Sequence, residues 1–244
     1  MGEVWAIVVA GGSGSRFGGA VPKQFLELAG LRVIDWALAA AGASCDGVVA
    51  VIPADHLDGP PVVGSAPGRG SAGFVAVAGG PSRSASVRAG LAAVPDDAAV
   101  IVVHDAARPL AGPALFERVV AAVRAGADGA VPGVPVPDTI KRVDPDGGQV
   151  VETLDRPALR AIQTPQAFAA AVLRAAHAGG AEATDDAALV EAAGGRVVVV
   201  EGDPGNLKVT GPDDLVRAEA ILTRRSPGGG GCPPDKGGES RQEL

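Results

Sequence analysis

Short runs of apolar, mostly β-branched residues recur along the chain, and Ala- and Leu-rich segments lie between them. Within most runs the apolar residues are consecutive, which is typical of strands in a sheet covered on both faces. The runs predict strands over Val4–Ala10, Gly47–Ile52, Phe74–Ala78, Ala99–Val103, Gly129–Val136 and Arg196–Glu201. The intervening segments predict amphipathic helices over Arg32–Ala43, Arg83–Val94, Pro113–Ala125 and Asp185–Ala193. This alternation predicts an α/β fold with a mostly parallel sheet, helices on both faces and right-handed crossovers.

Two regions break the alternation. Strand-like pieces at Thr139–Val143 and Val150–Thr153 flank a Pro-Asp-Gly-Gly turn and predict a projecting hairpin, an arm of about residues 138–163. Such a hairpin must bury its apolar side, so we expect it to pack against a second subunit of a homodimer. Residues 225–244 combine Gly, Pro and charge without periodicity and predict a disordered tail, which leaves one domain over residues 1–224. The Gly- and Pro-rich stretch Gly59–Gly73 predicts a loose loop.

Composition narrows the class of protein. With 244 residues the chain is long enough for one substantial core. A net charge of −7 argues against a dedicated nucleic-acid binder. Cys45 and Cys232 are far apart and have no ligand-like spacing, so a reducing compartment is expected. The chain has neither a signal-like start nor an apolar run of about 18 residues, which predicts a cytoplasmic protein without a membrane partner.

A Gly-rich loop follows the first predicted strand, where ligands bind in open α/β sheets. Its glycines let backbone N–H groups approach a phosphate, but the loop lacks a Walker lysine, and Phe17 breaks the dinucleotide pattern. Arg16 and Lys23 flank the loop and would offer a guanidinium fork and a point charge to a triphosphate. A ligand-free turn with solvated surface charges is the alternative.

A second cluster, from His104 to Pro109, follows the predicted strand Ala99–Val103. Asp105 is well placed there to hold Mg²⁺ against phosphate oxygens. The alternative is that Asp105 caps a turn and pairs with Arg108. His104 is expected to shape this turn, whereas His56 and His177 are expected at the surface.

A third cluster contains Gly80, Arg83 and Ser86 at the start of a predicted helix, where N–H groups favour an anion or a polar base edge. Ordinary capping by Ser82 or Ser84 would explain the same residues. A fourth cluster places Lys208 in an apolar, β-rich run, where it would point at phosphate from a strand end. Asp213 and Asp214 fit the first turn of a helix that begins near Pro212.

Seven segments in order resemble the 2-C-methyl-D-erythritol 4-phosphate cytidylyltransferase family over about residues 4–222. They are the Gly-Ser-Gly-Ser-Arg16-Phe loop with Pro22-Lys23-Gln24-Phe25-Leu26, Gly79-Gly80 with Arg83 and Ser86-Val87, Val103 to Pro109, Asp138-Thr139-Ile-Lys141, Gln163 to Phe168, Thr184-Asp185-Asp186-Ala, and Asn206-Leu-Lys208-Val-Thr.

The resemblance implies a Rossmann-like nucleotidyltransferase fold of the glycosyltransferase-A type, a homodimer, Mg²⁺ dependence and CMP transfer from CTP to methylerythritol phosphate. It implies catalytic roles for Arg16, Lys23 and Lys208, and metal binding by Asp105. The CTP-binding positions that it implies are Ala10, Gly11, Gly12, Gly14, Gly80, Arg83, Ser86 and Arg108. It further implies that Thr139 and Arg156 bind the acceptor phosphate, partly from the partner subunit, with Arg160 as the alternative to Arg156.

Three other functions share parts of this sequence pattern. A ribitol 5-phosphate cytidylyltransferase would share the Gly-rich loop, the Pro-Lys-Gln segment and the His-Asp cluster. A non-catalytic nucleotide sensor of the same fold would be expected to have lost Lys23, Asp105 or Lys208, and the chain has all three. A dinucleotide-dependent oxidoreductase is disfavoured by the broken fingerprint at Phe17.

Overall fold

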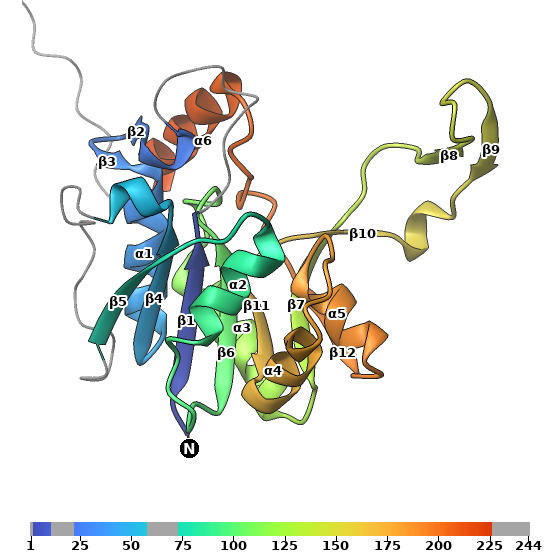
Figure 1. The fold of residues 1–244 in the computed structure, drawn as a ribbon. Helices are drawn as coiled ribbons and strands as arrows, with labels where there is room; N and C mark the ends of the chain where they lie inside the picture. Colours follow the sequence, from blue (N-terminus) through green and yellow to red (C-terminus); the bar gives the residue numbers. More distant parts are fainter. Residues whose placement is uncertain (1, 11–21, 58–72, 226–244) are drawn as a thin grey trace, which may run out of the picture.

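A mixed eight-stranded sheet forms the centre of the molecule (Figure 1). The structure is a computed structural model and describes residues 2–10, 22–57 and 73–225. The strands of this sheet are β1 (Val4–Val9), β4 (Gly47–Ile52), β5 (Gly73–Ala78), β6 (Val100–Asp105), β7 (Gly129–Pro135), β10 (Arg160–Ile162), β11 (Gln166–Ala169) and β12 (Val197–Glu201). They run in the order β10-β7-β11-β6-β1-β4-β5, and β12 pairs with the other side of β7.

The sheet is parallel except for two strands. β1 pairs in parallel with β4 and β6, β4 with β5, and β7 with β12. β11 is antiparallel to both β6 and β7, and β10 is antiparallel to β7. The predicted mostly parallel α/β fold is therefore confirmed, and all six predicted strands are present with ends shifted by at most two residues.

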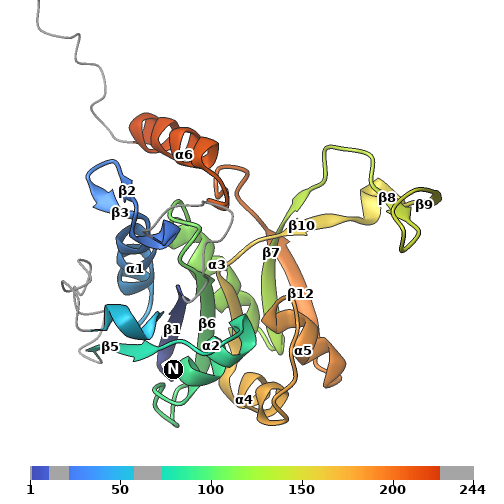
Figure 2. The same cartoon turned by 45° about the horizontal axis from the view of Figure 1, so that its top comes forward.

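Helices cover both faces of the sheet, as predicted (Figure 2). α1 (Val33–Ser44) and α3 (Pro113–Arg124) cover one face, and α2 (Arg83–Leu91), α4 (Ala170–Ala178) and α5 (Asp186–Ala192) cover the other. Each layer closes over its own apolar cluster: Ala6, Val8 and Phe116 belong to the first, and Ile7, Ile101 and Phe168 to the second. Strand residues alternate between the two clusters, which explains why both faces of the strands are apolar.

A further helix and three short helical turns complete the described part. α6 (Pro212–Arg225) covers a small apolar cluster that includes Leu28, Leu110 and Val209. The short turns are η2 (Lys23–Phe25), η3 (Ala54–His56) and η4 (Arg156–Ala158), and β2 (Glu27–Leu28) pairs with β3 (Leu31–Arg32). Arg225, assigned to the tail from the sequence, instead ends α6, where it donates to Leu110 O and Asp203. Residues 226–244 and most of the predicted loop Gly59–Gly73 lie outside the described residues.

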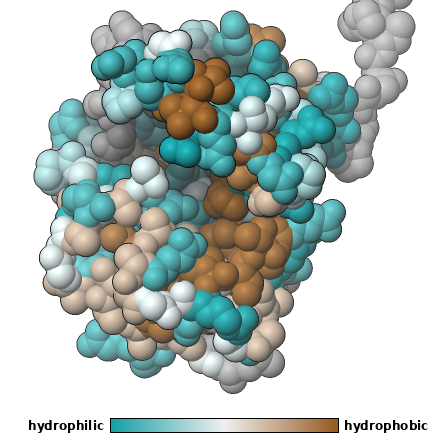
Figure 3. Space-filling view, turned by 90° about the vertical axis from the view of Figure 1, so that its right-hand side faces the viewer, coloured by the Kyte–Doolittle hydropathy of each residue, from teal (hydrophilic) through white to brown (hydrophobic). Residues whose placement is uncertain are grey.

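The predicted arm is present. β8 (Lys141–Val143) and β9 (Val150–Thr153) form an antiparallel hairpin that projects from the body (Figure 1). Val143, Val150 and Val151 on this hairpin are 48–55% exposed, as is Val199 of β12 at 54%. Figure 3 views the molecule from the side of the arm and shows apolar surface both on the arm and on the body beneath it.

One feature of the described residues differs from expectation. His177 is buried rather than at the surface, because its ring pairs with the buried carboxylate of Asp186. None of the described helices is both long enough and apolar enough to span a bilayer.

Candidate functional site

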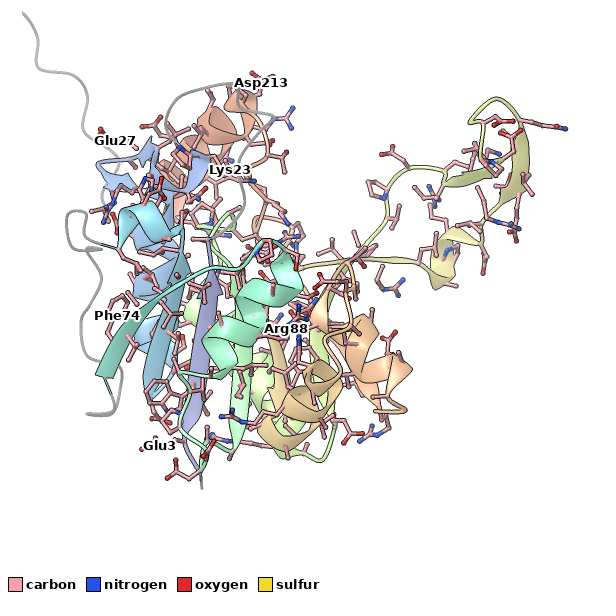
Figure 4. The ribbon with its side chains drawn as sticks, viewed as in Figure 1. Glu3, Lys23, Glu27, Phe74, Arg88 and Asp213 are labelled. Carbon is pink, nitrogen blue, oxygen red and sulfur yellow. The ribbon has the colours of Figure 1, made fainter. Side chains whose placement is uncertain are left out.

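A pocket of about 350 Å³ opens at the carboxyl ends of β1 and β6. In open α/β sheets this is the edge at which ligands bind. Lys23 lies at this edge in Figure 4, and Glu3 marks the opposite, amino-terminal end of β1. The pocket is lined by Val9, Ala10, Lys23, Gln24, Pro81, Ser82, Arg83, Ser86, Asp105, Ala106, Ala107 and Lys208. Six of the residues proposed from the sequence therefore meet here although up to 198 positions separate Ala10 from Lys208.

Asp105 is the charged centre of the pocket. It is the last residue of β6, and its side chain is 13% exposed. Lys208 Nζ donates to Oδ2 at 2.7 Å, and Arg83 Nε donates to Oδ1 at 3.3 Å. Burial opposes ionisation of this carboxyl group, but Arg83 and then Lys208 outweigh it and lower its pKa to about 2. Asp105 is therefore a carboxylate across the physiological pH range.

The turn after β6 is held by a chain of hydrogen bonds through a buried imidazole. The backbone N–H of Asp105 donates to Thr164 Oγ1 at 3.0 Å, and Thr164 Oγ1 lies 3.0 Å from His104 Nδ1. His104 Nε2 lies 3.2 Å from Arg108 O, a group that only accepts. The carbonyl partner places a proton on Nε2, and Nδ1 of a neutral imidazole then accepts from the Thr164 hydroxyl. Burial lowers the pKa of His104 to about 4, in agreement with that state.

Arg108 does not pair with Asp105, contrary to the alternative considered from the sequence. Its guanidinium donates to Asn206 O at 2.9 Å and to Ile162 O at 3.3 Å. Arg108 thus ties the β6 turn to the segment that carries Lys208, and it is not among the residues that line the pocket.

The start of α2 contributes Arg83 and Ser86. Ser82 caps the helix by accepting from Ala85 N at 3.0 Å, so the capping alternative is correct for Ser82. Ser86 Oγ accepts from Gly80 N at 3.1 Å and donates to Ser82 O at 2.8 Å. A Cβ on Gly80 would lie 2.6 Å from Ala85 Cβ, which explains the glycine. Gly80 supports Ser86 but is not among the lining residues.

Lys23 and Lys208 reach the pocket from two loops. Lys23 Nζ donates to Val209 O at 3.0 Å, which links η2 to the Lys208 segment. The apolar run around Lys208 had suggested a strand, but Lys208 does not lie in one. The run is apolar because Val209 is buried beneath α6. The backbone N–H of Val209 donates one hydrogen bond, of 2.7 Å, to Ala107 O.

Sequence reasoning assigned no role to two groups that shape the site. Gln24 is 2% exposed, and its Nε2 donates to Ala10 O at 2.6 Å, which fixes the end of β1. Asp186 is fully buried behind Arg83. Both residues occur in the segments that carry the family resemblance, and this was the only signal that pointed to them.

The proposed acceptor residues lie away from the pocket. Thr139 and Arg156 are exposed on the arm, and Arg156 donates to Pro137 O at 2.8 Å. Arg160 is also exposed, and its guanidinium donates to Pro157 O and Leu159 O of its own segment. None of the three lines the pocket of its own chain. Gly11, Gly12, Gly14 and Arg16 lie outside the described residues.

The pocket suits a magnesium ion bound together with phosphates. Mg²⁺ is commonly held by one or two carboxylates plus substrate phosphate oxygens rather than by an all-protein cage. Asp105 offers one such carboxylate at the pocket, and within residues 2–10, 22–57 and 73–225 no group of three acidic, His or Cys side chains could form a cage.

Comparisons with known proteins agree with this geometry. The family model for 2-C-methyl-D-erythritol 4-phosphate cytidylyltransferase matches residues 4–224. The protein of that name from Nocardia farcinica is 47% identical over 228 residues, which cover 92% of this chain and 96% of that protein. The bifunctional enzyme IspD/IspF of Clavibacter michiganensis is 46% identical over 222 residues, and this chain spans about half of its length, 54%.

Solved structures give the same result. The crystal structure of 2-C-methyl-D-erythritol 4-phosphate cytidylyltransferase from Thermus thermophilus is similar with a TM-score of 0.72 and 36% identity, covering 90% of this chain and 98% of that one. The family match spans almost all the described residues and includes every side chain that lines the pocket. The chain belongs to the 2-C-methyl-D-erythritol 4-phosphate cytidylyltransferase family.

Proposed function

We propose that this chain transfers CMP from CTP to 2-C-methyl-D-erythritol 4-phosphate, giving 4-diphosphocytidyl-2-C-methyl-D-erythritol and pyrophosphate. The observation that carries the proposal is the convergence of Lys23, Lys208 and Arg83 around one ionised carboxylate, Asp105, in the pocket at the sheet edge. Family membership supplies the nucleotide and the acceptor.

The reaction needs no general base. The acceptor is a phosphate monoester whose second pKa is near 6, so its oxygen is already anionic at neutral pH. That oxygen attacks the α-phosphorus of CTP in line, a P–O bond forms, and the bond to pyrophosphate breaks. Among the described residues that line the pocket, Asp105 is the only carboxyl group and there is no His, and two cations hold Asp105 ionised, which fits this chemistry.

Charge repulsion between two anionic reactants is the main obstacle, and the pocket cations offset it. Lys23 and Lys208 bind phosphate oxygens in the reacting geometry, and Arg16 joins them from the Gly-rich loop. Asp105 would hold Mg²⁺, which when bound would neutralise charge on the phosphate oxygens of CTP.

The remaining CTP contacts follow the edge of the sheet. Gly11, Gly12 and Gly14 would offer backbone N–H groups to the triphosphate beside Ala10, whose own N–H donates to Val51 O at 2.8 Å. Arg83 and Ser86 face cytosine and ribose, and Gly80 supports Ser86. Arg108 keeps the two loops of the pocket together, since its guanidinium bonds to Asn206 O.

The acceptor is bound with the help of a second subunit. Thr139 and Arg156 lie on an arm that projects away from the chain's own pocket, and the exposed valines of the arm need a surface to cover them (Figure 3). In a homodimer, each arm would bring these two residues to the partner's pocket.

The proposal is tested by replacing Lys23 with alanine. Loss of one preorganised cation would lower kcat by about two to three orders of magnitude, by analogy with removal of an oxyanion-hole donor, which costs roughly 3–4 kcal/mol. Arg124→Ala is the matched control, because Arg124 is exposed near the opposite edge of the sheet and donates to Gly2 O. Pyrophosphate release and thermal unfolding are measured for both variants. Normal turnover by Lys23→Ala would refute its role, and a cleft that binds CTP without any turnover would favour the sensor function.

A further inference from the structure

A line of ionisable side chains in contact with one another runs from α4 to the pocket. His177 lies in α4, Asp186 begins α5, Arg83 begins α2, and Asp105 ends β6. His177 Nε2 is 3.0 Å from Asp186 Oδ1, and Arg83 Nη1 is 2.8 Å from Asp186 Oδ2. On its other side Arg83 donates from Nε to Asp105 at 3.3 Å. The Arg83 guanidinium thus links β6 to α5, and Asp186 links α5 to α4.

Asp186 is the unusual member of this line. Its side chain is fully buried, and a buried carboxylate is costly unless cations or donors surround it. It is not needed as a helix cap, because the neighbouring Asp185 caps α5 by accepting from Ala188 N at 3.0 Å. Since buried ion pairs contribute little net stability, this carboxylate calls for an explanation other than folding.

Arg83 is shared unequally between two carboxylates. Its contact with Asp186 is shorter than its contact with Asp105, 2.8 Å against 3.3 Å. Burial alone would lower the pKa of Arg83, but Asp186 and then Asp105 raise it above its usual value. Among the described residues neither Nη1 nor Nη2 of Arg83 makes a well-formed hydrogen bond, and Arg83 lines the pocket. The guanidinium is therefore held between the two carboxylates by an ion pair with Asp186 and by the Nε hydrogen bond to Asp105.

We infer that Asp186 is a positioning residue that draws the Arg83 guanidinium away from Asp105 and so weakens the competition of Arg83 with a divalent cation for Asp105. The inference rests on the proposed function, in which Asp105 holds Mg²⁺. A guanidinium makes strong bidentate pairs with a carboxylate. Without the charge of Asp186, Asp105 would be the remaining anionic partner of Arg83, and the two would pair fully. His177 steadies the arrangement by donating from Nε2 to Asp186, because a carboxylate can only accept.

The test is the affinity of the protein for Mn²⁺ alone, measured without nucleotide from the electron paramagnetic resonance signal of the free ion. Asp186→Asn keeps the shape and the hydrogen bond to His177 but removes the charge. We expect the Mn²⁺ midpoint to rise about tenfold, which corresponds to roughly 1.4 kcal/mol. The Mg²⁺ concentration at half-maximal turnover should rise in parallel, while kcat at saturating Mg²⁺ changes little.

Asp46→Asn is the matched control, since Asp46 accepts from Val4 N at the opposite end of the sheet. It should leave the Mn²⁺ midpoint unchanged. A wild-type Mn²⁺ midpoint in folded Asp186→Asn, or no Mn²⁺ binding by the wild type at millimolar concentration, would overturn the inference.

A double-mutant cycle separates action through Arg83 from a general loss of structure. In an Arg83→Met background, Asp186→Asn should have no further effect on the Mn²⁺ midpoint. This double variant has no unpaired buried charge between α2 and α5, so it answers the question even if Asp186→Asn alone unfolds. A tenfold weakening by Asp186→Asn that persists in the Arg83→Met background would overturn the role. Mn²⁺ binding is measured without CTP or acceptor. Failure of the wild type to transfer CMP would therefore be a separate result, which contradicts the proposed function and not the role of Asp186.

Discussion

At the scale of single residues, the neutral state of His104 links the pocket to pH. The unfolded chain takes up a proton at His104 near pH 6.5, whereas in the folded chain burial lowers the pKa of this group to about 4. The unfolded state therefore binds more protons between these values, and stability falls as pH drops through this window. Above pH 6.5 both states are neutral and the contribution is constant.

His104→Gln should remove this part of the acid sensitivity. We expect the variant to be less stable at pH 7, because the bonds to Thr164 and Arg108 are weakened. The stability of the wild type should approach that of the variant between pH 6.5 and 4, by up to about 3 kcal/mol. Urea unfolding across this range measures it, with His56→Gln as the control. Parallel pH profiles for wild type and His104→Gln would contradict the account. The contribution of Asp105 is separate, because it is present above pH 3.8 and is lost only as pH falls through about 2.

Some residues of the site could be predicted from the sequence and others could not, and the difference lies in the kind of contact that each residue makes. Lys23, Asp105 and Lys208 were identified because each adjoins a predicted strand or the Gly-rich, phosphate-binding loop pattern. The topology of the sheet then brings such positions together. Asp186 and His177 form a pair nine residues apart behind the pocket, and His177 was wrongly expected at the surface. Single polar residues with buried long-range partners, such as Gln24 and Thr164, have no local pattern that predicts the contact.

At the scale of elements, consecutive apolar runs predicted the parallel strands because both faces of each strand are covered. β11 was missed because residues 166–178 form an Ala-rich stretch that resembles one helix, whereas its first four residues pair with β6 and β7. β10 was missed because Arg160–Ile162 is short and exposed. Tertiary pairing overrode local propensity in both segments.

The turn between β5 and α2 makes Gly80 a test at this scale. An alanine Cβ would lie 2.6 Å from Ala85 Cβ and 3.0 Å from its carbonyl carbon, so the turn must move away from α2. Gly80→Ala should destabilise the protein by about 1–3 kcal/mol, as overpacking does, and raise KM for CTP because Ser86 loses its bond to Gly80 N. Gly179→Ala is the control, since a Cβ there meets nothing within 4 Å. Equal stability and equal KM for the two variants would show that the turn tolerates the side chain.

At the scale of the whole molecule, the separation of the arm from its own pocket predicts shared active sites. A Lys23→Ala chain has an intact arm, and an Arg156→Ala chain has an intact pocket. Each variant alone should be nearly inactive. Mixing them under conditions of subunit exchange should restore about a quarter of wild-type turnover, because half of the dimers are mixed and each contains one complete site.

Sedimentation of the wild type should give a homodimer. When both substitutions are placed on the same chain, its dimers should be inactive, because they contain no complete site. A monomer that turns over normally, or mixed variants that stay inactive despite proven exchange, would rule out the shared site.

The central claim is that this pocket moves CMP from CTP to methylerythritol phosphate. The most direct measurement follows CTP labelled at the α-phosphorus, incubated with Mg²⁺ and either 2-C-methyl-D-erythritol 4-phosphate or ribitol 5-phosphate. The account predicts that the label passes into a diphosphocytidyl product with the first acceptor, one pyrophosphate is released for each product formed, and ribitol 5-phosphate reacts far more slowly. Label that remains in CTP with both acceptors, or that moves preferentially to ribitol 5-phosphate, would contradict it.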